Sequence, residues 1–280
     1  MKTKIPEELK ADIPQTKWGK ILSVTPVIMT VVATLLAGLA SSEMTRAQYD
    51  RALGAQLQSK AGDQWSYFQA KKLRGAMQRN SFELLQATTD ATLSENLTLP
   101  KVPSPTPLNL DTNVETALHA LEKQAPESEM VEHLKSVGNE TLAAALQAAK
   151  ENATVFDVAT TEAGKKLDEL EKSLLVGDKT AARQFAAAKM RYNAARYETE
   201  ARVNQNIASL YELQVRKANI SAERHHKRSG KFFFGMLAAQ AAVIVSTFAI
   251  AARQRSFLWS VAAVAGIAAI IFAIYVYLKV

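Results

Sequence analysis

The chain has no cysteine among its 280 residues. Disulfides, thiolate catalysis, zinc–thiolate sites and iron–sulfur clusters are therefore excluded. The sequence also lacks the Gly-x-x-x-x-Gly-Lys phosphate loop, the Gly-x-Ser-x-Gly nucleophile motif and the His-Glu-x-x-His zinc motif. We therefore predict a protein that is not an enzyme and that needs no cofactor and no metal.

Charge is missing from three long, mostly apolar runs. Ile21–Ala40, Phe232–Ala252 and Phe257–Leu278 are uncharged over 20, 21 and 22 residues. At about 1.5 Å per helical residue, each run spans the roughly 30 Å hydrocarbon core of a bilayer. The sequence predicts one membrane span near the start and a two-span hairpin at the end. Since no span contains an ionisable side chain, a pump or transporter is not expected.

The net charge of +7 gathers near these spans. Residues 231–280 carry four basic and no acidic side chains, whereas residues 87–182 carry 16 acidic and 8 basic ones. Basic residues beside apolar spans are typical of headgroup contacts, so the expected partner is the lipid bilayer and not a nucleic acid. The candidate headgroup residues are Arg224, His226, Lys227, Arg228, Lys231, Arg253 and Arg255.

The flanking charges also indicate an orientation. Lys17 and Lys20 precede the first span and Glu43 follows it, while the short loop of residues 253–256 holds two arginines. Both features place the N-terminus and the short loop inside, so residues 43–230 lie outside, which in a bacterium is the periplasm. A cytoplasmic location is the alternative, because a basic cluster precedes the second span. The first span is longer than the apolar part of a signal peptide, so we read it as an uncleaved anchor.

The segments between the spans follow from prolines, glycines and apolar spacing. Thr112 and Glu115 form a capping-box pattern, so a helix is expected over residues 113–124. A second helix is expected over 127–160, with a break at Gly138-Asn139, and a third over 161–176. The predicted order is an N-terminal tail (1–20), a transmembrane helix (21–41), stalk helix A (42–87), an extended, solvated Pro/Ser/Thr linker (88–111), an acidic helical segment (112–177), stalk helix B (178–230) and the transmembrane hairpin (231–280).

Both stalk helices carry a narrow apolar stripe. In helix A the stripe comprises Leu53, Leu57, Ala61, Gln64 or Trp65, Phe68, Lys72 or Leu73, and Ala76. Such stripes favour antiparallel pairing in a coiled-coil-like stalk. Equal heights above the membrane then predict contacts of Trp65 and Phe68 with residues 203–211. The candidate packing or docking residues are Asp63, Trp65, Tyr67, Phe68, Lys71, Val203, Ile207 and Leu210; ordinary helix packing is the alternative.

Small residues at four-residue spacing occur in the terminal hairpin. They allow close approach of membrane helices, although general smallness in an alanine-rich hairpin explains them equally well. The residues are Gly235, Ala239, Ala262 and Gly266.

The run Asp63-Gln64-Trp65-Ser66-Tyr67-Phe68-Gln69-Ala70-Lys71, placed after a first span, resembles a bacterial membrane family known as domain of unknown function 4337. The terminal hairpin agrees, with His226, an aromatic start at Phe232 and the segment 253–259 between the spans. The resemblance covers both ends of the chain and not its acidic middle. It implies the membrane topology and a bacterial origin, and it implies no reaction.

Together these patterns predict an all-α membrane protein with three transmembrane helices, a long antiparallel helical stalk and a small distal helical segment. The expected function is a multi-pass inner-membrane scaffold or docking subunit, which associates with itself or with another membrane protein complex. The alternative is a membrane-anchored sensor or regulator whose acidic segment binds a cation or a basic ligand.

Overall fold

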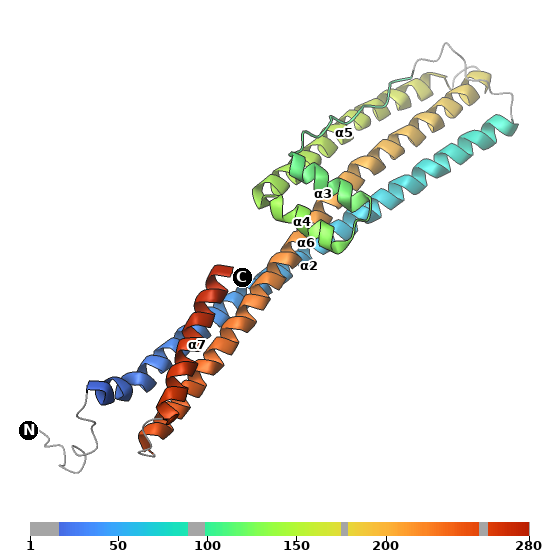
Figure 1. The fold of residues 1–280 in the computed structure, drawn as a ribbon. Coiled ribbons are helices and arrows are strands. Elements are labelled where there is room, and N and C mark those ends of the chain that lie inside the picture. Colours follow the sequence, from blue (N-terminus) through green and yellow to red (C-terminus); the bar gives the residue numbers. More distant parts are fainter. Residues whose placement is uncertain (1–16, 89–98, 175–178, 252–256, 280) are drawn as a thin grey trace, which may run out of the picture. The chain divides into compact units, whose positions relative to one another are not determined.

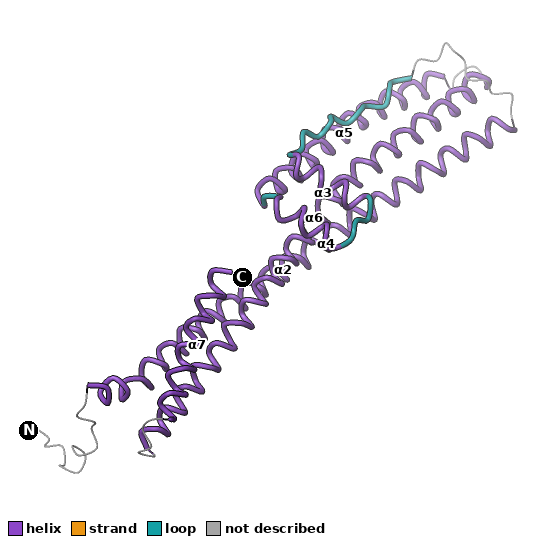
Figure 2. Tube along the Cα trace, in the orientation of Figure 1, coloured by secondary structure: helices purple, strands orange, loops and turns teal. Residues whose placement is uncertain are grey.

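The computed structural model of the chain describes residues 17–88, 99–174, 179–251 and 257–279. Its elements are all α-helices, and the described residues contain no strand (Figure 2). The predicted all-α class is therefore confirmed. The helices are α2 (Lys17–Thr88), α3 (Thr112–Glu122), α4 (Glu127–Ser136), α5 (Asn139–Leu174), α6 (Lys179–Ala251) and α7 (Phe257–Lys279) (Figure 1).

The chain divides into two compact units. The terminal unit comprises residues 1–51 and 219–280, and the central unit comprises residues 52–218. Helices α2 and α6 each contribute to both units, because neither ends at the boundary that the sequence predicted between a span and a stalk helix. Pro26 lies inside α2 and does not end it.

Two buried clusters form the interior of the terminal unit, where α2, α6 and α7 pack together. Ala33, Ala239 and Ala269 make one of them. Leu36, Ala40, Phe232 and Val276 make the other. Many other large apolar side chains of the same helices are exposed. They include Val27, Val31, Leu35, Ile244, Phe248, Val264, Ile267 and Ile271.

Two of the helices, α2 and α6, contain stretches long and apolar enough to cross a membrane. The third candidate, residues 260–276 of α7, is apolar but shorter than a full span within the described residues.

Helix α6 is the centre of the central unit. Residues 207–211 are buried at five consecutive positions, which requires neighbours on every side of the helix. Figures 1 and 2 show α6 between α5 and α2 in this unit. Most half-buried and buried residues in this part of α2 recur at alternating steps of three and four. They are Gly54, Leu57, Ala61, Gln64, Phe68, Lys71, Gly75, Gln78, Phe82 and Leu85. Trp65 is half-buried as well, next to Gln64.

This spacing corrects the predicted stripe of α2 at three of its apolar positions. Leu53, Leu73 and Ala76 are exposed, while Lys71 and Gly75 face α6. A Cβ atom at Gly75 would lie 3.4 Å from the Cβ atom of Tyr197. A small residue is therefore placed where the two backbones come close, and the apolar Leu73 points away.

The cap of α3 differs from the predicted capping box. The N-cap is Asp111 and not Thr112, because the Asp111 carboxylate accepts a hydrogen bond from the Asn113 amide at 2.9 Å. An aspartate oxygen satisfies one of the free N–H groups of the first turn as well as a threonine hydroxyl would.

The break at Gly138-Asn139 is present, because α4 ends at Ser136 and α5 begins at Asn139. The predicted break near Thr160 is wrong, and α5 continues to Leu174. No proline interrupts the sequence there, and the Thr160 hydroxyl donates to the Asp157 carbonyl along the helix.

The second half of the predicted linker is packed rather than solvated. Leu99 and Val102 lie against a cluster that includes Phe185 of α6. The Thr106 amide donates to the Asn152 side chain at 3.0 Å, and the Asn152 side chain donates to the Thr106 carbonyl at 2.5 Å. These bonds satisfy backbone groups that prolines prevent from joining a helix.

Candidate functional site

Helices α2 and α6 run antiparallel in the central unit and are joined by ion pairs. Lys71 Nζ lies 2.5 Å from Glu200 Oε2, and Arg79 Nη2 lies 2.9 Å from Glu198 Oε2. Gly75 meets Tyr197 between these two pairs. The pairs differ in burial, because Glu200 is buried whereas Glu198 is exposed. The same helix pair therefore contains one sheltered and one solvated ion pair.

The sheltered pair is part of a larger cluster on α6. Arg196 Nε lies 3.5 Å from the second Glu200 oxygen, and the Arg196 guanidinium stacks 4.6 Å from the Tyr197 ring centre. Lys71 Nζ lies 5.6 Å from the same ring centre. Burial raises the pKa of the nearby Tyr192 hydroxyl, which keeps this phenol neutral. Two cations thus share one buried carboxylate and one aromatic ring.

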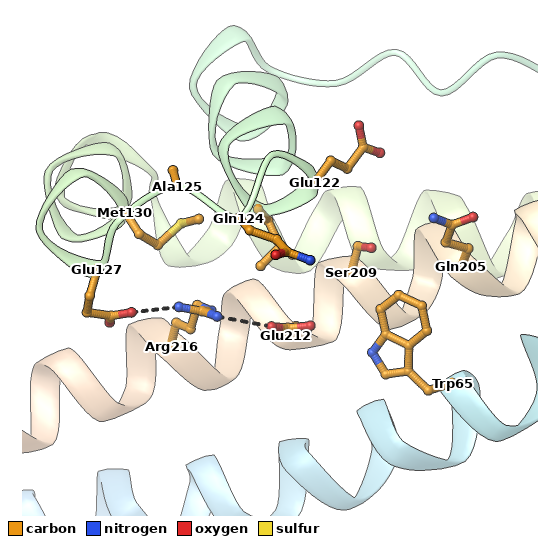
Figure 3. Close-up of a pocket in the computed structure, with 11 residues that line it drawn as sticks. Trp65, Glu122, Gln124, Ala125, Glu127, Met130, Gln205, Ser209, Glu212 and Arg216 are labelled. Atoms are coloured by element: carbon orange, nitrogen blue, oxygen red, sulfur yellow. Dashed lines mark hydrogen bonds and ion pairs between the residues drawn. The ribbon is translucent and has the colours of Figure 1, made fainter.

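A cavity of about 710 Å³ lies between Trp65 of α2, the α3–α4 turn and α6 (Figure 3). Arg216 crosses one end of it, donating to Glu127 at 2.7 Å and to Glu212 at 3.2 Å. Trp65 forms its wall on α2 and meets Phe68 edge to face, with the ring centres 5.5 Å apart. The polar residues that line the cavity are Glu122, Gln124, Glu127, Gln205, Ser209, Glu212 and Arg216.

The turn over this cavity has a left-handed residue that is not glycine. Gln124 has a φ of 54°. Its amide donates to the Leu121 carbonyl, and the Ala125 amide donates to the Ala120 carbonyl, which ends α3 in a Schellman-type turn. Glycine is the usual residue at such a position. The left-handed backbone of Gln124 lowers the stability of the turn, and it places an amide side chain at the cavity.

The residue after Arg216 on α6, Lys217, makes a second contact with the region around α4. Its ammonium group donates to the carbonyl of Val137, which lies between α4 and α5. Burial lowers the pKa of Lys217, because the charged form loses hydration there. Arg216 and Lys217 together tie α4 to α6.

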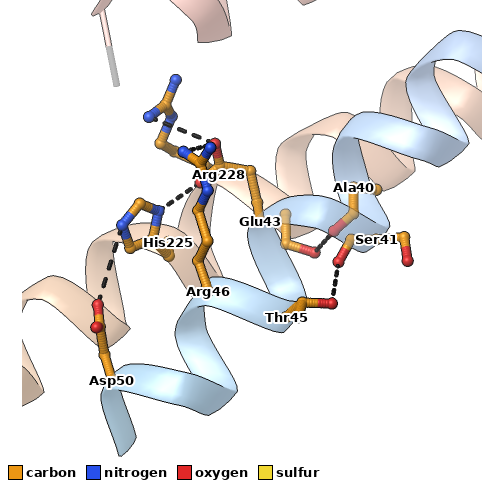
Figure 4. A network of polar contacts seen from close by, with 9 residues as sticks. Ala40, Ser41, Glu43, Thr45, Arg46, Asp50, His225 and Arg228 are labelled. Atoms are coloured by element: carbon orange, nitrogen blue, oxygen red, sulfur yellow. Dashed lines mark hydrogen bonds and ion pairs between the residues drawn. The ribbon is translucent and has the colours of Figure 1, made fainter.

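A second polar network belongs to the terminal unit (Figure 4). The buried Glu43 lies 2.5 Å from His225 Nδ1 and 3.5 Å from an Arg228 nitrogen. His225 Nε2 lies 4.0 Å from Asp50 Oδ2. The Ser229 hydroxyl donates to the Ala40 carbonyl at 2.7 Å, in the same region. This network links α2 to α6 at the ends of their long uncharged stretches.

The sequence-predicted docking residues fall into three groups by burial. Val203, Ile207 and Leu210 are buried in the core around α6, so they are packing residues. Trp65, Phe68 and Lys71 are half-buried between α2 and α6, whereas Asp63 and Tyr67 are exposed. Trp65 shares its cavity with Gln205 and Ser209, and Phe68 shares a smaller one with Ala201 and Gln205.

The small residues of the hairpin lie between helices. A Cβ atom added at Gly266 would be 2.6 Å from the Met29 sulfur, and one at Gly235 would be 3.4 Å from Leu36. Ala239 and Ala262 are fully buried.

The candidate headgroup residues do not all face outward. Arg228 turns toward Glu43, Lys227 pairs with Glu223 at 3.4 Å, and Lys231 lies 6.0 Å from the centre of the Tyr275 ring. Arg224 and His226 are exposed. Arg253 and Arg255 lie outside the described residues.

Within the described residues, no group of three His, Asp or Glu side chains lies close enough to hold a metal ion. The described residues provide ion pairs that join α2 to α6 and a cavity beneath the α3–α4 turn.

Comparison with known protein families assigns the chain to one of them. A family described as a domain of unknown function, DUF4337, matches residues 18–162, which is more than half of the chain. The chain belongs to this family. The DUF4337 match runs through the acidic segment into α5 and does not include the terminal hairpin. The predicted membership is confirmed, while the predicted extent, at both ends and not in the middle, is corrected. No curated protein and no solved structure matches the chain.

Sequence reasoning missed Glu43, His225 and Glu200 as the centres of the polar networks. Glu43 and His225 are separated by 182 positions, so no local spacing could connect them. The one available signal was the position of Glu43 directly after a long uncharged run.

Proposed function

We propose that this DUF4337 protein is a non-enzymatic, multi-pass protein of the bacterial inner membrane that docks a partner through its central unit. The terminal unit crosses the bilayer with three helices, and α2 and α6 form an antiparallel, coiled-coil-like stalk. The partner is a second copy of the chain or another membrane protein complex. The central unit lies in the periplasm.

The surface of the terminal unit supports the membrane part of the proposal. Its helices bury many alanines together with Leu36, Phe232 and Val276, and they expose most of their valine, isoleucine and phenylalanine side chains. Membrane bundles pack in this way, because lipid accepts large apolar side chains while small ones allow close helix contact. In water such a surface would be a strong aggregation site.

The open face of α2 is the observation that carries the docking role. Three large side chains on the part of α2 in the central unit form an exposed stripe and are 59–66% exposed. Their spacing of four and seven residues places them on one side of the helix, opposite to the residues that face α6. Exposed apolar stripes of this kind mark interaction surfaces. The residues are Leu73, Met77 and Leu84. Tyr67 is also exposed, but it lies on another side of the helix, where it lines a cavity with Glu200 and Val203.

The proposal is tested by the mass of the detergent-extracted protein, measured by size-exclusion chromatography with light scattering. We expect an oligomer or a stable complex for the native chain. Replacing Leu73 and Met77 by Gln should dissociate it without lowering the thermal midpoint, since both side chains are exposed. The matched control replaces Val155 and Val158 of α5, which are also exposed, and should leave the assembly intact. A lone native monomer that also retains no protein in a mild-salt pulldown contradicts the docking role.

The orientation has its own test, which the absence of native cysteine makes simple. Single cysteines replace Lys150 and Arg255, and intact spheroplasts are treated with a membrane-impermeant maleimide. Labelling at position 150 alone supports a periplasmic central unit. Labelling at position 255 alone places that unit in the cytoplasm.

A further inference from the structure

A serine hydroxyl opens onto the cavity beneath the α3–α4 turn. Ser209 is only 6% exposed and lines the cavity, and none of the hydrogen bonds among the described residues involves its hydroxyl. Figure 3 shows this hydroxyl on the side of α6 that faces the turn. Since protein atoms cover most of this residue, a ligand or water in the cavity is the partner left for the hydroxyl.

The charge of the lining favours a cation. Three carboxylates line the cavity, those of Glu122, Glu127 and Glu212. Arg216 is the one cationic side chain among the described lining residues, and two of these carboxylates already engage it. The cavity therefore keeps a net negative charge, which attracts a cation and repels an anion.

The apolar part of the lining favours an organic cation with a carbon chain. Trp65 forms one wall, and Met130 and Leu121 contribute to the lining. An indole ring attracts an ammonium group through its π-face and also packs against methylene groups. The volume of about 710 Å³ lies within the range of small-molecule sites, roughly 300–1,000 Å³.

A bare metal ion fits this arrangement poorly. Calcium requires six to eight oxygen ligands around one point. No three acidic or histidine side chains in the described part of the chain converge closely enough. Carboxylates spread around a cavity suit a ligand whose positive charges are also spread along its length.

We propose that this cavity binds an aliphatic polyamine. One ammonium group pairs with Glu122 at the open edge, and a second donates to the Ser209 hydroxyl near Glu212. The methylene chain between them lies along Trp65. This inference goes beyond the docking role and does not depend on it.

Isothermal titration calorimetry of the full-length chain in neutral detergent, with spermidine as the probe, tests the proposal. We expect one molecule bound per chain. Glu122→Gln and Ser209→Ala should each weaken binding about five- to tenfold, as expected for the loss of one hydrogen bond to a charged group. The matched control is Glu132→Gln on α4, which removes an equal charge outside the cavity and should leave the affinity unchanged.

Two further titrations test whether the cavity selects a polyamine over a metal ion and over a single ammonium group. Magnesium chloride at equal ionic strength should not compete beyond its screening effect. N-acetyl-lysine amide, which carries a single ammonium group, should bind at least tenfold more weakly than spermidine. Absence of binding heat, equal weakening by Glu132→Gln, full competition by magnesium, or equal affinity for the lysine analogue would each overturn the proposal. The last result would assign the cavity to a lysine side chain of a protein partner.

Discussion

Burial, and not the presence of an ion pair, should decide what each acidic residue of α6 contributes to stability. Glu198 and Glu200 lie two positions apart, and each pairs with a basic residue of α2. The Glu200 side chain is 11% exposed and its partner Lys71 is 27% exposed. The Glu198 side chain is 48% exposed and its partner Arg79 is 59% exposed. Replacing each glutamate by glutamine therefore compares two similar pairs in different environments.

The expected magnitudes follow from these exposures. Exposed pairs contribute about 0–1 kcal/mol, and loss of one partner from a fully buried pair costs about 3–5 kcal/mol. The Glu200 pair is intermediate, so Glu200→Gln should cost about 2 kcal/mol, whereas Glu198→Gln should cost less than about 1 kcal/mol. For a unit of this size, about 2 kcal/mol lowers the thermal midpoint by roughly 4–8 °C.

The assay is thermal unfolding of the full-length protein in neutral detergent, followed by far-ultraviolet circular dichroism, which reports helix content. A double-mutant cycle with Lys71→Met separates the pair from other effects of Glu200. The double variant should be less destabilised than the sum of the single variants by about 1–2 kcal/mol. Equal midpoints for the two glutamine variants, or an additive cycle, would refute the reasoning from burial.

Three further changes test other parts of the structure, all measured by the same unfolding assay. Gln124→Gly should raise the free energy of unfolding by about 1 kcal/mol, since glycine adopts a positive φ without a steric cost; a loss of stability would show that the amide side chain matters more. Gly266→Ala should cost about 1 kcal/mol because Met29 must move, whereas Gly235→Ala should be nearly neutral. Carboxylates of α5 raise the pKa of Lys189 above its usual 10.5, so the stability lost in Lys189→Met should be constant below about pH 10 and shrink as the pH rises above 10.5. A difference that grows with alkaline pH would contradict this sign.

The parts of the fold that follow from local patterns could be predicted from the sequence. Helix content, the break at Gly138-Asn139 and the approximate start of α3 depend on propensity, glycine and capping, which are local properties. Errors arose where a local signal was weak or where tertiary contacts decided. A helix end was predicted near Thr160, although no proline lies there. The second half of the linker is packed and not solvated, because Leu99 and Val102 contact a buried cluster.

The candidate sites were harder to predict, because they depend on contacts between distant segments. An apolar stripe placed Leu73 in the interface of α2, although the regular three- and four-residue spacing places Lys71 and Gly75 there. Lys71 can be half-buried in this interface because it pairs with Glu200, which lies more than 100 positions later in the chain. The cavity beneath the α3–α4 turn likewise requires three separate segments. No single-sequence pattern contains that information.

The two units differ in what their helices expose, although α2 and α6 pass through both. In the terminal unit both helices expose large apolar side chains, among them Val31 and Leu35 of α2 and Phe248 of α6. Between residues 179 and 218, α6 exposes none of its large apolar side chains and buries Phe185, Ile207, Leu210 and Leu213. The change coincides with the network of Glu43, His225 and Arg228, where the first charged groups after the uncharged run of α2 meet α6. Since a carboxylate is tolerated near lipid only when it is neutralised, pairing at this point is what a helix leaving a bilayer requires. The proposed membrane boundary therefore rests on side-chain chemistry as well as on the length of the apolar runs.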